Sequence, residues 1–219
     1  MGHKVQQEQV KRAAESLARV EAAVAVLKAV GPKPKAEEAQ TVLDAWSDVL
    51  TYGNRVFTRL EQGAKVGAAK GWFDGVKHLR RTDELLSYML HARNADEHGL
   101  HSVADDVPSS VTVSAPRNMR AGEMLVRPIL ADEPGPPNII GWEPGPRAKV
   151  TEFKPRHIAL RAVYDRSVRY ELPSRHMDTD IADLEPATLA DLFASYLAKL
   201  VLELGGVPKG ALAAPDPDG

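Results

Sequence analysis

Five polar or charged residues crowd six consecutive positions near the middle of the chain: Arg93, Asn94, Asp96, Glu97 and His98. Residues four apart lie on one face of a helix, so Asn94 is a neighbour of His98 and Arg93 is a neighbour of Glu97. A histidine titrates near neutral pH and can serve as an acid or a base. An arginine can hold two phosphate oxygens at once. Together these residue types could combine proton transfer with anion binding.

The same residues could instead form a charged helix end in solvent. Glu97 would then pair with Arg93, and His98 would sit favourably at the negative end of the helix dipole. Arg93, however, continues an apolar stripe that runs from Leu79 to Leu90 on the expected helix. Because arginine is rarely buried without a partner, its place at the end of such a stripe calls for an explanation.

The spacing of this cluster resembles the R-x4-6-H signature of the HEPN superfamily (higher eukaryotes and prokaryotes nucleotide-binding). The matching residues are Arg93, the polar Asn94 that follows it, and His98. That family carries the motif at the end of a long bundle helix, and the resemblance covers about residues 36–101. It implies a homodimer of helical bundles in which the Arg and His of both subunits surround one cleft and cleave RNA without a metal.

The resemblance assigns catalytic roles to Arg93, Asn94 and His98 alone. The histidine would take the proton of an RNA 2′-hydroxyl or donate one to the leaving oxygen, and the guanidinium would hold the phosphate as charge develops. Asp96 and Glu97 would support this site, although their charge repels a phosphate backbone. Basic residues more than two turns earlier on the same expected helix cannot offset that charge locally but would guide RNA to the cleft: Lys77, Arg80 and Arg81.

Three histidines beside this cluster allow a metal site. His91, His98 and His101 are spaced seven and three apart, with Glu97 adjacent, and helical bundles hold metals with such side chains. Three scattered surface histidines explain the same spacing. The leading hypothesis therefore assigns no residue to a metal. No glycine-rich phosphate loop or dinucleotide fingerprint occurs in the sequence, so no cofactor is expected.

A second polar group follows in the later part of the chain. Asp165 and Arg166 precede Tyr170 in a strand–turn–strand pattern, and His176 lies in the next loop. Asp165 is expected to cap a turn and to pair with Arg166 or another neighbour, and Tyr170 is expected to pack. No chemistry is assigned to these residues.

Three long segments in the first half have the periodicity of amphipathic helices: residues 4–30, 36–63 and 72–97. Gly31 and Pro32 stop the first segment, and Gly99 stands where a C′ glycine ends a helix. Because the connections are short, the helices are expected to pack side by side as an antiparallel bundle. A fourth helix could come from a partner chain.

The second half favours strands, expected at 111–113, 124–126, 148–153, 158–164 and 169–172. The proline- and glycine-rich stretch 132–146 is expected to be a long loop pinned by Trp142. A clear amphipathic helix covers 186–204, with Pro186 suited to its first turn.

The predicted fold is therefore α+β, with an N-terminal antiparallel helical bundle and a C-terminal antiparallel sheet covered by one helix. The bundle, which is HEPN-like by resemblance, comprises residues 1–106. The strand-rich region with its helix comprises 107–207, and a flexible tail comprises 208–219.

Composition limits the class of protein. The net charge is −2, which excludes a strongly basic nucleic-acid coat but not a local basic site. The chain has no cysteine, and neither a membrane-spanning run nor a signal peptide is evident, so no membrane partner and a cytoplasmic location are expected. The leading hypothesis is a HEPN-like, RNA-directed module acting as a metal-independent ribonuclease of a bacterial stress or defence system. The alternatives are a non-catalytic dimeric interaction protein and, third, a metal-binding bundle.

Overall fold

The computed structural model describes residues 7–65, 68–98, 102–114, 126–130, 139–145 and 149–205. The chain forms two compact units. One comprises Met1–Val107 together with His157–Gly219, and the other comprises Pro108–Arg156. The residues after 157, which the sequence places with the strand-rich region, thus pack with the helices of residues 1–107.

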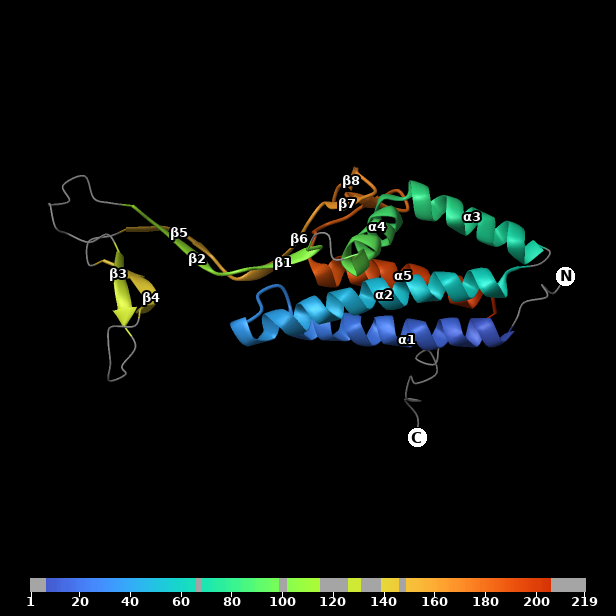
Figure 1. The fold of residues 1–219 in the computed structure, drawn as a ribbon, viewed down its shortest axis with the longest axis horizontal. Coiled ribbons are helices and arrows are strands. Elements are labelled where there is room, and N and C mark those ends of the chain that lie inside the picture. The colour runs from blue at the N-terminus through green and yellow to red at the C-terminus, as the bar shows by residue number, and fades with distance from the viewer. Residues whose placement is uncertain are drawn as a thin grey trace, which may run out of the picture. The chain divides into compact units, whose positions relative to one another are not determined.

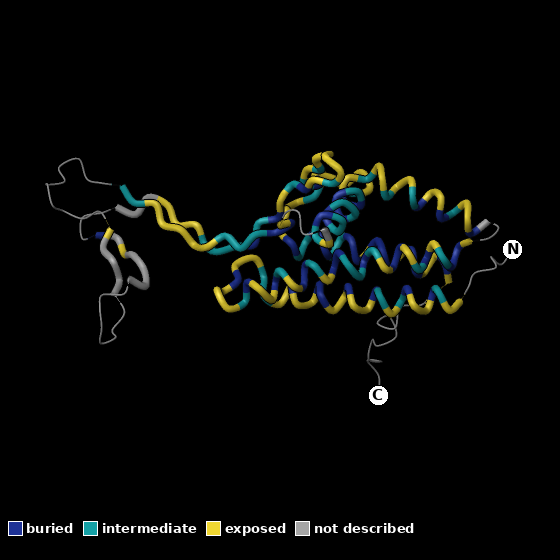
Figure 2. Tube along the Cα trace, viewed as in Figure 1, coloured by how far each residue is buried: buried dark blue, intermediate teal, exposed yellow. Residues whose placement is uncertain are grey.

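Three long helices build the core of the first unit. Helices α1 (Gln7–Val30) and α2 (Ala39–Gly63) form an antiparallel pair, and α5 (Pro186–Glu203) packs against both (Figure 1). The short 3-10 helix η1 (Ala36–Glu38) leads into α2. Buried positions recur three and four residues apart along these helices. Figure 2 shows buried and exposed stretches alternating along them. The largest fully buried side chains include Trp46, Tyr88, Phe57, Leu17, Leu27, Leu60 and Leu189.

The helix expected at 72–97 is in fact two helices, α3 (Ala68–Thr82) and α4 (Glu84–His98). Asp83 separates them: its N–H donates to the carbonyl of Leu79, and its carboxylate accepts the N–H of Leu86 at 3.0 Å. Asp83 is therefore the N-cap of α4. The expected apolar stripe does not cross this break, because Leu79 is 39% exposed whereas Leu86 is buried. The apolar period of one helix therefore cannot be extended past Asp83, because a second helix with its own axis begins there.

Short antiparallel ladders complete the first unit. Strand β1 (Ala104–Val107) pairs with β6 (His157–Leu160), β7 (Val163–Asp165) with β8 (Val168–Tyr170), and β9 (Arg175–His176) with β10 (Thr179–Asp180). The last two pairs are tight hairpins. Both central residues of each turn have positive φ, as type I′ turns require: Arg166, Ser167, Met177 and Asp178.

The β9–β10 hairpin is fastened to the start of α4. One carboxylate oxygen of Glu84 accepts two hydrogen bonds from Ser174: one from its backbone N–H at 2.8 Å and one from its side-chain hydroxyl at 2.9 Å. The carboxylate of Asp83 also accepts the N–H of Met177 at 2.8 Å and lies 3.0 Å from Nδ1 of His176. The first residues of α4 thus hold a hairpin that is some ninety positions later in the sequence.

The second unit consists of two further ladders. Strand β2 (Ser110–Ser114) pairs with β5 (Lys149–Lys154), and β3 (Val126–Leu130) pairs with β4 (Ile139–Pro144). The stretch 132–146, expected to be a loop, therefore contains a strand, because proline at its end does not prevent pairing of the residues before it. The side chain of Trp142 lies outside the described residues, as do Met124 and Leu125 of the expected strand 124–126.

The predicted α+β class is confirmed: five α-helices and five two-stranded antiparallel ladders occur among the described residues. The helix expected at 186–204 is also confirmed, and α5 contacts β6 as well as α1 and α2. No helix in the described part of the chain is long and apolar enough to cross a membrane.

Close packing of α2 on α5 gives the first prediction. A Cβ added at Gly53 would lie 2.9 Å from Cζ of Phe193, and closer still to Cε1. We expect Gly53→Ala to lower the free energy of unfolding by up to about 2 kcal/mol, because overpacking of about 1–3 kcal/mol is opposed by a gain in helix propensity of about 1 kcal/mol. Urea unfolding measures this. Gly75→Ala on α3, where nothing lies within 4 Å, is the control and should stabilise; equal effects at both sites would contradict the packing.

The Asp83 cap gives a pH prediction. Burial alone would raise the pKa of this carboxyl, but the N–H groups of Met177 and Leu86 and the ring of His176 lower it below its usual range. The ionised form therefore stabilises the fold above the unfolded-state pKa of about 3.9, and this contribution is lost as the pH falls through the lower folded-state pKa.

We expect Asp83→Ala to cost about 2 kcal/mol at pH 7, from the lost cap and the unpaired N–H groups. The stability difference between wild type and Asp83→Asn should shrink as the pH falls below about 4. Urea unfolding from pH 7 to 2 provides the measurement. A difference that stays constant to pH 2 would show that the charge of Asp83 contributes nothing.

Candidate functional site at the end of helix α4

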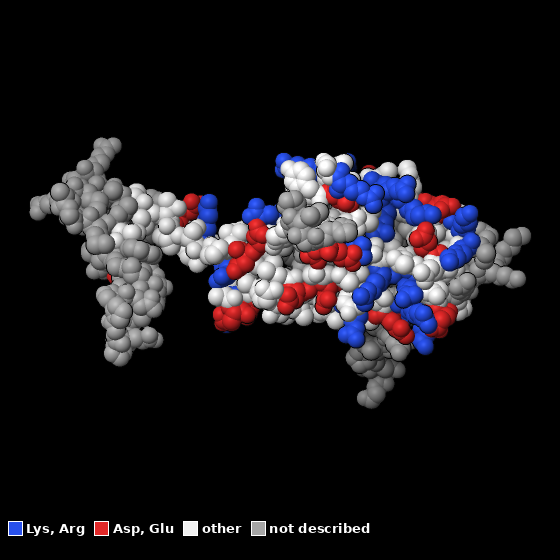
Figure 3. Space-filling model, viewed as in Figure 1, with Lys and Arg blue, Asp and Glu red and all other residues white. Residues whose placement is uncertain are grey.

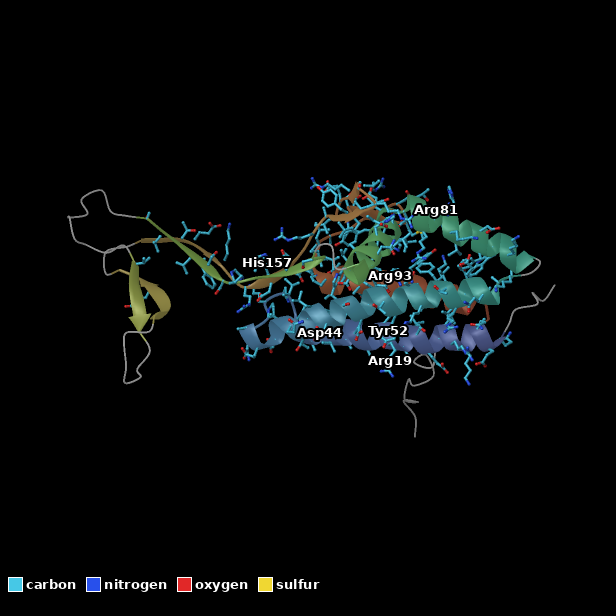
Figure 4. All side chains as sticks on the ribbon, in the orientation of Figure 1. Arg19, Asp44, Tyr52, Arg81, Arg93 and His157 are labelled. Atoms are coloured by element: carbon cyan, nitrogen blue, oxygen red, sulfur yellow. The ribbon has the colours of Figure 1, made fainter. Side chains whose placement is uncertain are left out.

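Arg93 lies on α4 (Figure 4), and only part of its hydrogen-bonding capacity is used by the described residues. Its guanidinium forms an ion pair with Glu97, one turn later, and donates to Oδ1 of Asn94 at 3.3 Å. The side chain is 27% exposed, yet its Nε is buried and has no hydrogen-bond partner among the described residues. The pairing with Glu97 follows the i,i+4 spacing of the sequence. The unpartnered Nε indicates that this pairing does not account for Arg93 completely.

A second arginine, Arg80 of α3, lies close enough for the charge of Arg93 to act on it. Its guanidinium donates to Oδ1 of Asn54 at 2.7 Å and lies 4.2 Å from the ring centroid of Phe57. Its Nε is also buried without a partner in the described part of the chain. Burial, and then the positive charge of Arg93, lower the pKa of Arg80 to about 10, so it remains charged at neutral pH.

Arg80 lies closer to Arg93 than its place more than two turns earlier in the sequence indicates. A continuous helix would separate positions 80 and 93 by about 20 Å along its axis. The break at Asp83 lets α4 run in a different direction from α3, so Arg80 comes within electrostatic range of Arg93.

The other expected guiding residues remain on the surface of α3. Lys77 forms an ion pair with Asp74 at 2.8 Å and contacts Glu61 at 3.5 Å. Arg81 is exposed near the end of the helix (Figure 4). Figure 3 shows basic side chains over α3 with acidic side chains among them. Of the three guiding residues, Arg80 is the one whose pKa is lowered by the charge of Arg93.

Asn94 links α4 to the β7–β8 hairpin. Its Nδ2 donates to Oδ2 of Asp165 at 2.8 Å, and Nδ1 of His91 lies 2.7 Å from the same oxygen. The imidazole of His91 stacks on Tyr170 with 3.5 Å between ring centroids and 13° between planes. Hydrogen bonds from Asn94 and His91 lower the pKa of the Asp165 carboxyl. One face of the helix is therefore held by a carboxylate from a distant hairpin.

The two acidic residues of the cluster have different roles. Asp96 accepts a hydrogen bond from the hydroxyl of Ser47 on α2 at 2.6 Å, so its carboxylate is engaged with the bundle. Glu97 is 41% exposed and pairs with Arg93. Only Glu97 therefore competes directly with an anion for the guanidinium of Arg93.

His98 is the last residue of α4, and its side chain lies outside the described residues, as does His101. The helical period places position 98 on the same face as positions 91 and 94. A metal site built on His91, His98 and His101 thus involves side chains that are not described. Among the side chains that are described, no three His, Asp or Glu residues come together in a way that could hold a metal ion.

Sequence reasoning missed the contribution of Asp165. It was expected to pair with Arg166 or another neighbour, whereas its hydrogen-bond partners Asn94 and His91 lie 71 and 74 positions earlier. The expected packing of Tyr170 is confirmed, with His91 as the partner. The turn pattern did indicate a hairpin here, but no local signal indicates which helix that hairpin meets.

Comparisons of the chain with protein-family models, with curated proteins and with solved structures found no match. The site is therefore interpreted from its own geometry and from the spacing of Arg93, Asn94 and His98. Arg80 and Arg93 each have an Nε without a hydrogen-bond partner in the described part of the chain, and each donates to a side-chain amide. Guanidinium groups with free donors are chemically suited to bind an anion.

The different roles of the two neighbouring acids give a prediction. Asp96→Ala should lower the free energy of unfolding by about 1–2 kcal/mol, because the hydroxyl of Ser47 loses a charged acceptor. Glu97→Ala should change it by less than about 1 kcal/mol, as expected for a half-exposed ion pair. Urea unfolding of both variants compares them. A larger cost for Glu97→Ala than for Asp96→Ala would show that the Arg93–Glu97 pair is the structural contact.

Proposed function

We propose that this chain is an RNA-directed module that cleaves RNA without a metal ion, in a bacterial stress or defence system. Arg93, Asn94 and His98 would be its catalytic residues. The observation that carries the proposal is the pair Arg80 and Arg93, two cationic side chains from different helices, each with a buried Nε that has no hydrogen-bond partner among the residues that the structure describes. Leaving a buried donor unpaired costs about 1–3 kcal/mol, and a phosphate would offer acceptors to both.

The surroundings of these arginines support an anionic ligand. Among the described residues, the direct contacts of Arg80 are the neutral Asn54 amide and the Phe57 ring, and the carboxylate of Glu61 acts on its charge only through space. Asp96, whose charge would oppose a phosphate, is directed to Ser47 on α2. Glu97 is the remaining competitor, and its exposure allows it to move into solvent when a phosphate binds Arg93.

The chemistry follows from the residue types. A base removes the proton of the RNA 2′-hydroxyl, and the 2′-oxygen bonds to phosphorus while the bond to the 5′-oxygen breaks. An acid protonates that 5′-oxygen, leaving a 2′,3′-cyclic phosphate and a 5′-hydroxyl. His98 would perform one of these proton transfers, and Arg93 would hold the charged phosphate oxygens. A homodimer would supply a second copy of both residues for the other transfer.

A non-catalytic dimeric interaction protein is the second candidate, and the second unit favours it. Val111 of β2 and Phe153 of β5 are directly opposite one another in the ladder and are 49% and 62% exposed. Opposite residues share a face of a ladder, so two apolar side chains stand together in solvent. Such a pair suits contact with another protein. In this case the Arg93–Glu97 pair would be a structural helix end.

Cleavage of mixed RNA in the presence of EDTA tests the proposal. We expect the wild type to produce fragments that end in cyclic phosphate, and Arg93→Ala and His98→Ala to reduce kcat/KM by about 100-fold or more, because the charge clamp or the proton transfer is lost. Arg19→Ala, which removes an exposed arginine on α1, is the matched control and should keep full activity.

The result also separates the two candidates. Absence of both RNA cleavage and RNA binding at low salt would exclude the ribonuclease. If the Arg93 and Glu97 variants then change only stability or the dimer equilibrium measured by sedimentation, the interaction protein is favoured. Activity that requires added metal and disappears in EDTA would contradict the metal-independent mechanism.

A further inference from the structure

The Oδ2 atom of Asp165 is the meeting point of two side chains from α4. It accepts the Nδ2–H of Asn94 at 2.8 Å and lies 2.7 Å from Nδ1 of His91. The Asp165 side chain is only 10% exposed, so water competes weakly for these bonds. Hydrogen bonds to an ionised carboxylate are stronger than bonds between neutral groups. Asp165 therefore holds both side chains firmly.

The bond to Asp165 fixes the orientation of the Asn94 amide. A carboxylate accepts hydrogen bonds, so the NH2 group must face Asp165 and the carbonyl Oδ1 must face away from it. That Oδ1 accepts the hydrogen bond of Arg93 Nη1 at 3.3 Å. Rotating the amide by half a turn would place Oδ1 against the carboxylate and the NH2 against the guanidinium, and both contacts would become repulsive. The orientation of Asn94 toward Arg93 is thus determined by Asp165.

The hairpin that carries Asp165 is itself fixed on α4. Val163, two residues earlier, is 1% exposed, and the hydroxyl of Tyr88 on α4 donates to the carbonyl of Arg161 at 3.0 Å. Tyr170, opposite Val163 in the ladder, stacks on His91. The carboxylate is therefore presented by a packed element, as a residue that orients another side chain requires.

We propose that Asp165 is a positioning residue for Arg93, acting through the amide of Asn94, so that the β7–β8 hairpin is part of the α4 site. The expected effect of Asp165 on RNA cleavage rests on the proposed function. The expected effect of Asp165 on the orientation of Arg93 rests only on the hydrogen bonds from Asp165 to Asn94 and from Asn94 to Arg93. Without Asp165 the Asn94 amide turns, and Arg93 loses the acceptor that orients it toward a phosphate.

Kinetics of RNA cleavage in EDTA test the first effect. Asp165→Ala should lower kcat by about 100-fold, as a misplaced catalytic group does, while KM changes little because the phosphate-binding charge remains. Asp165→Asn keeps an acceptor oxygen and should recover a large part of the loss. Asp105→Ala is the matched control: it removes a carboxylate from β1 that pairs with Arg161 and does not touch Asn94.

A double-mutant cycle separates positioning from general stabilisation. If Asp165 acts through Asn94, the variant with both Asn94→Ala and Asp165→Ala should be no slower than Asn94→Ala alone. Independent, multiplied losses would overturn the proposal. So would an unchanged kcat in a folded Asp165→Ala protein, with folding judged by its circular dichroism and urea unfolding. If Asp165→Ala does not fold, the same comparison is made with Asp165→Leu, which also lacks an acceptor oxygen but keeps a side chain that is branched at Cγ, as aspartate is.

A readout without RNA keeps this inference distinct from the proposed function. In 15N-resolved NMR spectra, the side-chain amide of Asn94 and the Nε–H of Arg93 should both shift in Asp165→Ala and Asp165→Asn, but not in Asp105→Ala. If the wild type does not cleave RNA, the proposed function fails while these shifts still support the positioning of Arg93. If the Arg93 signal stays unchanged in folded Asp165 variants, the positioning role is refuted whether or not RNA is cleaved.

Discussion

The carboxylate and backbone of Asp83 are the constraint on which the candidate site depends. By ending α3 and capping α4, this residue changes the direction of the chain between two segments whose sequence reads as one helix. The change of direction brings Arg80 within electrostatic range of Arg93. The same carboxylate accepts the N–H of Met177, so the cap also holds the β9–β10 hairpin on α4. One residue therefore sets both the direction of the helix and the position of an element after it.

The helices were predictable because each buries a wide apolar face, which local periodicity records. The break at Asp83 was not, because an aspartate fits the polar face of an amphipathic helix as readily as it fits an N-cap. An aspartate on a helix face and an aspartate at an N-cap differ in the N–H groups that its carboxylate accepts. For Asp83, one of these is the N–H of Met177, 94 positions later in the sequence. Long-range partners of this kind leave no periodic signal.

The site shows the same limit. The pairing of Arg93 with Glu97 follows from a spacing of four residues and was expected. The contacts of Asp96 with Ser47 and of Asn94 with Asp165 join elements separated by 49 and 71 positions. A spacing motif can identify residues that share a helix face, but it cannot state which carboxylate is turned toward the bundle and which toward the arginine. That assignment changes the electrostatics of the cluster, since it leaves only Glu97 opposed to an anion.

The contacts of Arg80 bear on whether Arg80 and Arg93 have a structural role or an anion-binding role. A structural arginine that is partly buried is usually compensated by a carboxylate. Arg80 contacts an amide and an aromatic ring, which accept its hydrogen bond and lie against its face without cancelling its charge. Its pKa of about 10 reflects burial and the repulsion of Arg93, opposed in part by the more distant carboxylate of Glu61, and it stays about three units above neutral pH, so Arg80 remains cationic. The positive charges of Arg80 and Arg93 repel one another, and Glu97 compensates only Arg93 directly. Under the proposed function, a phosphate bound between the two guanidinium groups would relieve this repulsion.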